Sequence, residues 1–69
     1  MTVKQAHKKA VKRWGVGCEV VHRIGAGVRG KETIEEFKLY NWQDEEMGFS
    51  NQSFEDAFKD ADRREHIKQ

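Results

Sequence analysis

Apolar residues recur at helical spacing over the first fourteen positions of the chain. The apolar positions 3, 6, 10, 11 and 14 form one stripe on a helical wheel together with His7. Lysines and an arginine occupy most of the remaining circumference. Thr2 and Gln5 fit a capping box, and Gly15 is well placed to end the helix. The pattern therefore predicts an amphipathic helix over residues 2–14.

An alternating, β-branched segment follows this helix. Residues 16–24 contain Val20, Val21 and Ile24, which favour extended backbone and alternate with polar positions. The glycine-rich residues 25–30 then predict a turn or loop. We expect one strand that ends in a flexible connection.

The pattern of residues 32–42 is compatible with two conformations. Thr33 and Glu36 could open a helix, but the large side chains scatter around a helical wheel instead of forming a stripe. Their aromatic content favours a strand, which would complete a β-hairpin across the glycine loop. Residues 43–46 read as a polar turn, and residues 47–50 could add a short third strand.

A second helix is predicted over residues 53–66. Ser53 is a suitable N-cap, and Glu55 and Asp56 lie in the first turn, where the helix dipole favours anions. The element order predicts an α+β fold: helix, two- or three-stranded antiparallel sheet, helix, with both helices on one face of the sheet. Besides the valines, the following large side chains are expected to supply the core: Trp14, Ile24, Ile34, Phe37, Leu39, Tyr40, Trp42, Phe49, Phe54 and Phe58.

Length and composition limit the fold further. A chain of 69 residues has room for one domain, residues 1–69, and its apolar and charged contents of 36% each leave a thin core. Cys18 is the only cysteine, so an internal disulfide is excluded. No apolar run approaches the roughly 18 residues that a membrane span requires. We expect a cytoplasmic protein with no membrane partner.

Charge is divided unevenly along the chain, although the net charge is only +1. Residues 1–31 hold eight basic residues and one acidic residue, a net charge of +7. Residues 32–69 hold five basic and eleven acidic residues, a net charge of −6. Such an asymmetry steers charged partners and makes head-to-tail contact between copies favourable, so a homo-oligomer is one expectation.

Residues 25–30 contain two short glycine patterns that are associated with phosphate binding. The segment matches G-x-G-x-x-G, but a dinucleotide-binding fold needs repeated βαβ units, which this chain is too short to supply. Residues 27–30 also match the G-x-x-G pattern of K-homology domains, but the helix pair of those domains is absent from the predicted elements. A hairpin loop is the simpler interpretation of both patterns.

Candidate catalytic and metal-binding residues do not converge. Cys18 and His22 would share one face of a strand about 13 Å apart, too far to hold one metal ion. The consecutive carboxylates of residues 44–46 lack the alternating spacing of a calcium loop. We expect no cofactor, no metal ion and no enzymatic activity.

Two binding functions remain. The first is a small non-catalytic protein-binding module, an inhibitor or regulator such as phages and mobile elements direct against host machinery. Its contact residues would be the acids of the acidic turn and the aromatic residues that flank them: Tyr40, Trp42, Asp44, Glu45, Glu46 and Phe49. The alternative is nucleic-acid binding through the basic first helix and the glycine loop. Its contact residues would be Lys4, Lys8, Lys9, Lys12, Arg13, Arg29 and Lys31.

Overall fold

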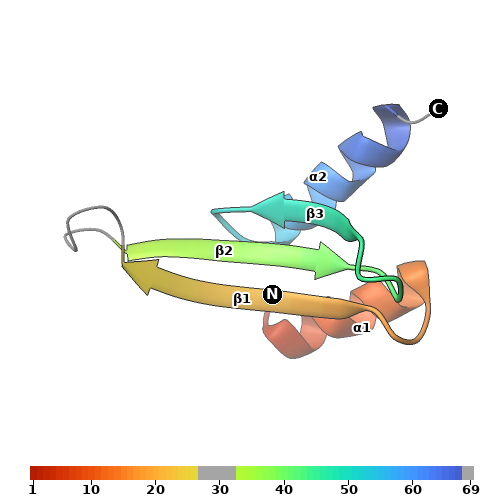
Figure 1. The fold of residues 1–69 in the computed structure, drawn as a ribbon, viewed down its shortest axis with the longest axis horizontal. Coiled ribbons are helices and arrows are strands. Elements are labelled where there is room, and N and C mark those ends of the chain that lie inside the picture. The colour runs from red at the N-terminus through yellow and green to blue at the C-terminus, as the bar shows by residue number, and fades with distance from the viewer. Residues whose placement is uncertain (27–32, 68–69) are drawn as a thin grey trace.

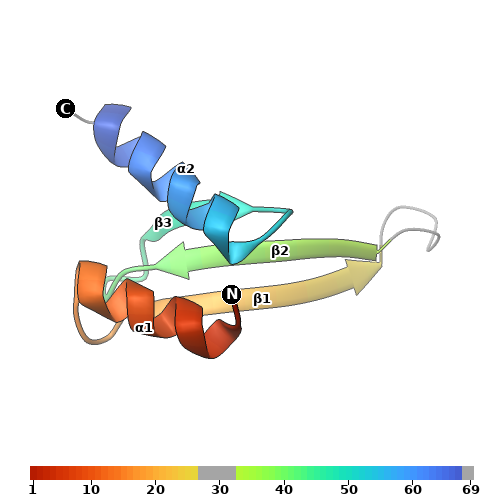
Figure 2. The same ribbon diagram turned by 180° about the vertical axis from the view of Figure 1, so that it is seen from behind.

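A three-stranded antiparallel sheet carries two helices on one of its faces in the computed structural model, which describes residues 1–26 and 33–67 (Figures 1 and 2). The elements are α1 (Val3–Trp14), β1 (Glu19–Ala26), β2 (Thr33–Tyr40), β3 (Glu46–Ser50) and α2 (Phe54–Ile67). The strands are ordered β1-β2-β3 in the sheet. The predicted α+β class, the third strand and the placement of both helices are confirmed.

Helix α1 begins and ends where its capping residues predict. The Thr2 hydroxyl accepts a hydrogen bond from the Gln5 backbone N–H at 3.1 Å, and the Gln5 side chain accepts one from the Thr2 backbone N–H at 2.9 Å. Gly15 follows the last helical residue with φ = +93°, a conformation that costs glycine little. Ala6 and Ala10 form the buried face of the helix.

The central hairpin resolves the ambiguity over residues 32–42 in favour of a strand. β1 and β2 pair in one continuous register from Glu19 opposite Tyr40 to Ala26 opposite Thr33. β1 starts three residues later than predicted, because Gly17 has φ = +100° and turns the chain before the ladder begins. Side chains alternate along β2, so that the buried residues lie toward the helices and the intervening residues lie on the opposite face.

Strand β3 and helix α2 pack unusually close together at Gly48. A Cβ atom added to this glycine would lie 2.3 Å from the carbonyl oxygen of Ala57. Glycine is therefore required where the backbones of β3 and α2 meet.

Helix α2 starts at the predicted cap, since the Ser53 hydroxyl accepts a hydrogen bond from the Asp56 N–H at 3.1 Å.

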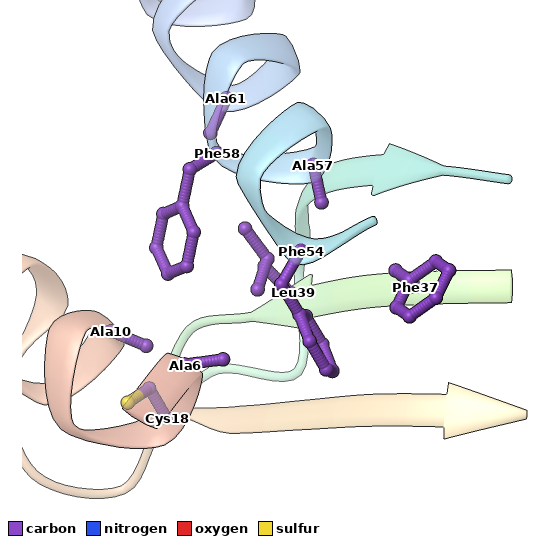
Figure 3. Packing of buried hydrophobic residues seen from close by; sticks show 9 residues of the cluster. All are labelled: Ala6, Ala10, Cys18, Phe37, Leu39, Phe54, Ala57, Phe58 and Ala61. Atoms are coloured by element: carbon purple, nitrogen blue, oxygen red, sulfur yellow. The ribbon is translucent and has the colours of Figure 1, made fainter. Parts of the chain in front are cut away.

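The core lies between the two helices and the sheet (Figure 3). Phe54 and Leu39 are the largest fully buried side chains. The buried apolar residues are Ala6, Ala10, Cys18, Phe37, Leu39, Phe54, Ala57, Phe58 and Ala61. Because four of these nine are alanines, the expectation of a thin core is confirmed.

Five residues of the described chain that were predicted to belong to the core are instead exposed. Ile24, Ile34 and Trp42 expose 61%, 41% and 64% of their surface, and Val3 and Val16 expose 46% and 88%. Ile24 lies in the half of the hairpin that projects beyond the helices, and Ile34 alternates onto the face without helices (Figures 1 and 2). Trp42 lies in the turn between β2 and β3.

Candidate functional site

The residues predicted to bind a protein partner fall into three groups. Trp42, Asp44 and Glu45 lie together on the β2–β3 turn. Tyr40 and Phe49 lie on the sheet face opposite the helices, here called the open face. Glu46 already forms an ion pair within the protein. The Arg64 guanidinium lies 3.1 Å from its carboxylate and donates a hydrogen bond to its backbone carbonyl oxygen at 3.2 Å.

The β2–β3 turn is braced by one side chain, that of Asn41. Its Oδ1 accepts hydrogen bonds from the N–H groups of Gln43 and Glu45 at 2.9 and 3.0 Å. Its amide group donates to the Glu45 carboxylate at 3.3 Å. Asp44 has φ = +60°, the left-handed position of a three-residue hairpin loop, which aspartate tolerates better than most residues. The turn is therefore ordered by its own hydrogen bonds.

Trp42 is presented to solvent by this turn and lies beside the loop between α1 and β1. A Cβ atom added to Gly17 would lie 3.1 Å from the Trp42 Cβ, so the two loops touch. The neighbouring Val16 is 88% exposed. We call Val16, Trp42, Asp44 and Glu45 the Trp42 corner.

Carboxylates without a cationic partner gather at this end of the sheet. Within residues 1–26 and 33–67, only Glu19, Asp44 and Glu45 lack a cationic group within 4.0 Å. Glu19 is the first residue of β1 and lies opposite Tyr40, which immediately precedes the braced turn. The free negative charge of the described chain is therefore concentrated beside exposed apolar surface.

The Asp60 carboxylate holds α2 against the edge of β3. Its Oδ2 accepts a hydrogen bond from the Phe49 N–H at 3.0 Å and lies 2.9 Å from the Arg64 guanidinium. Its Oδ1 accepts from Arg63. Burial alone would raise the pKa of Asp60, but the Phe49 N–H and the two arginines outweigh it and lower the pKa below its usual value.

The open face combines apolar side chains with charges of both signs. Lys38 lies opposite Val21 on one side and Phe49 on the other, and its Nζ is 5.9 Å from the centre of the Phe49 ring. Lys38 also approaches Glu36 at 3.8 Å. Toward the far end, a hollow of about 190 Å³ is lined by Arg23, Gly25, Ile34 and Glu36.

The predicted basic face of α1 is divided by the fold. Arg13 bridges to α2 through Asp62 at 2.6 Å and Glu65 at 2.9 Å. Burial opposes the charge of the Arg13 guanidinium, but these two carboxylates raise its pKa overall. Lys9 lies 4.7 Å from the centre of the Phe58 ring.

Three lysines of α1 remain available to a ligand. Lys4, Lys8 and Lys12 follow one another at four-residue spacing on the side away from the buried alanines, and no carboxylate of the described residues lies within 4.0 Å of them. Arg29 and Lys31, and with them the glycine patterns, lie outside the described residues.

Cys18 and His22 are both part of the packing. The thiol of Cys18 is buried, and burial raises its pKa. His22 stacks on Phe37 with ring centres 4.4 Å apart, and its Nε2 lies 3.5 Å from Glu35. No group of three or more potential metal-ligating side chains occurs among residues 1–26 and 33–67.

The sequence indicated the Trp42 turn but missed two of its neighbours. Val16 was predicted to lie in a strand, although its position between two glycines is a signal for a turn. In the sequence, Glu19 is distinctive only as the single acid of the basic half.

Neither helix, over its described residues, is long and apolar enough to cross a membrane. Comparisons of the chain with protein families, with curated proteins and with solved structures found no match.

Proposed function

We propose that this protein is a small non-catalytic protein-binding module, an inhibitor or regulator, that docks through the Trp42 corner. The observation that carries the proposal is the 64% exposure of Trp42 on a turn braced by Asn41. Tryptophan is enriched among the residues that dominate binding energy at protein interfaces. A braced turn also loses little conformational entropy on binding, which favours affinity.

The charge around the corner specifies the kind of partner. Asp44 and Glu45 have no cationic partner among the described residues, so a basic rim on the partner would complement them and speed association. We therefore propose an apolar pocket with basic residues around it as the docking site on the partner protein.

We propose a cytoplasmic location, where the free thiol of Cys18 would stay reduced.

Site-specific photo-crosslinking tests the proposal. A photoreactive amino acid replaces Gln43, the exposed neighbour of Trp42 in the turn, in one variant and Lys59, whose side chain is 80% exposed on α2, in a control, and both are expressed in the native cells. We expect an adduct with one other protein at position 43 and none at position 59. The adduct should disappear when Asp44→Asn and Glu45→Lys are added. No adduct at position 43, or equal adducts at both positions, would contradict the proposal.

Nucleic-acid binding through α1 is the second candidate. It is favoured by the stripe of Lys4, Lys8 and Lys12, which can reach several phosphates along one strand. The triple change to glutamine should weaken DNA or RNA binding and reduce the salt slope by about three, since each phosphate contact contributes about 0.9. Binding is measured at two salt concentrations, with Lys59→Gln as the matched control. Equal binding by wild type and triple variant would remove this candidate.

A further inference from the structure

The open face is the largest surface of the sheet that the described chain leaves uncovered. Both helices lie behind the sheet in Figure 1, which looks onto this face, and no helix crosses it. Val21, Tyr40 and Phe49 are only partly buried there, and Ile34 is 41% exposed. A sheet with a second apolar face commonly buries it against another sheet.

We propose that two copies of this chain associate through their open faces, with the strands of the two sheets antiparallel. The inference goes beyond the proposed function, because it uses the open face and leaves the exposed turn at Trp42 for another protein. A two-fold axis that runs parallel to the sheets, between the two copies and across the strands, generates this arrangement. It places each strand over the same strand of the second copy, with the order of residues reversed.

The charges of the open face complement one another under this rotation. Glu36 and Lys38 are neighbours on this face of β2, so reversal about the point between them places Lys38 over Glu36 of the second copy, twice. The same rotation places Glu19 over Gly25 of the second copy, one position along this face of β1 from Arg23. Within the described chain, neither Glu19 nor Arg23 has a charged partner of opposite sign within 4.0 Å.

The shape of the face is self-complementary about the same point. Tyr40 lies two residues beyond Lys38, and Ile34 lies two residues before Glu36, so the rotation places Tyr40 over Ile34 of the second copy. Ile34 lines the hollow of about 190 Å³. The phenol ring of Tyr40 would enter this hollow beside Arg23, a contact that combines apolar burial with cation–π attraction. The thin core gives the chain a further reason to bury this face.

A charge-reversal mixing experiment tests the arrangement. In Lys38→Glu each copy would place glutamate against Glu36 of the other, and in Glu36→Lys each would place lysine against Lys38. We expect wild type to form a dimer in sedimentation-velocity experiments, and each variant alone to bind itself at least tenfold more weakly. A mixture of the two variants should form a heterodimer, because both contacts then join unlike charges. Recovery on mixing also shows that the two variants are folded.

Three outcomes would overturn the inference: a wild type that stays monomeric up to several hundred micromolar, single variants that still dimerise, or a mixture that stays monomeric. The result is distinct from the test of the Trp42 corner. Trp42→Ala should leave the dimer unchanged, and the crosslink from position 43 should survive in Lys38→Glu.

Discussion

Asp60 shows how one carboxylate can connect a helix to a sheet edge. Its side chain is only 10% exposed and receives a backbone N–H from β3 and two guanidinium groups from its own helix. A carboxylate that accepts several charged or backbone hydrogen bonds is stabilised in its ionised form. The lowered pKa of Asp60 therefore couples folding to pH.

We predict that Asp60→Asn lowers the free energy of unfolding by about 2 kcal/mol at pH 7, since hydrogen bonds to charged groups contribute about 1.5–3 kcal/mol. The pKa in the folded state lies below that of the unfolded chain, which is about 3.9. The contribution of Asp60 is thus complete above the unfolded value and is lost as the pH falls through the folded value. The stability difference between wild type and variant should shrink below about pH 4.

Urea denaturation over a series of pH values measures this difference. Asp44→Asn is the control, because Asp44 is exposed and has no cationic partner in the described part of the chain. A gap between wild type and Asp60→Asn that stayed constant into strong acid would show that the ionised carboxylate does not hold the two elements together.

At the scale of elements, the contact between β3 and α2 depends on one missing side chain. In Gly48→Ala the new methyl group would meet the Ala57 carbonyl oxygen at 2.3 Å, so the backbone of β3 or of α2 would have to shift. We predict destabilisation by about 2–3 kcal/mol, the upper part of the range for overpacked cores. Gly25→Ala is the matched control, since its methyl group would meet no atom within 4 Å.

Thermal unfolding of the two variants at low protein concentration compares them directly. Gly48→Ala should melt well below wild type, whereas Gly25→Ala should change the melting temperature little. Equal melting temperatures for the two variants would mean that α2 can shift away from β3 at no cost.

The two ends of α1 were predictable because local residues set them, whereas the start of β1 was predicted three residues too early. Thr2, Gln5 and Gly15 fix the two ends of α1 through hydrogen bonds within a few residues of each other. The exposure of Ile24 was not predictable, because alternation assigns a side chain to a face of the sheet but does not tell how far the helices extend over that face, whereas Ile34 is exposed because it lies on the open face. For the same reason, the sequence shows no sign that Gly48 lies beneath a helix.

At the scale of the whole molecule, pairing between distant segments absorbs much of the charge asymmetry. Arg13 of the basic half binds two acids of α2, and the Met1 amino group lies 3.0 Å from Glu55. Counting charges along the sequence could not reveal this, since the pairs join residues far apart in the chain. Among the described residues, the charges without an opposite charge within 4.0 Å include the acids beside Trp42, the lysines of α1 and Arg23.

We predict that Arg13→Ala lowers the free energy of unfolding by about 1 kcal/mol, through loss of two partly exposed ion pairs and of contact with the Trp14 ring. Because salt screens such pairs, the difference from wild type should decrease at high ionic strength. Lys12→Ala is the control on the same helical turn. Urea denaturation at low and high salt checks both statements, and equal losses for the two variants would contradict them.

The bond from the Phe49 N–H to Asp60 also determines where the sheet could grow by strand addition. An incoming strand would find that donor on the outer edge of β3 occupied, whereas in the described chain nothing pairs with the outer edge of β1. The edge of β1 is therefore the more open of the two to an added strand, and loss of the Asp60 contact in acid would free the Phe49 N–H on the other edge.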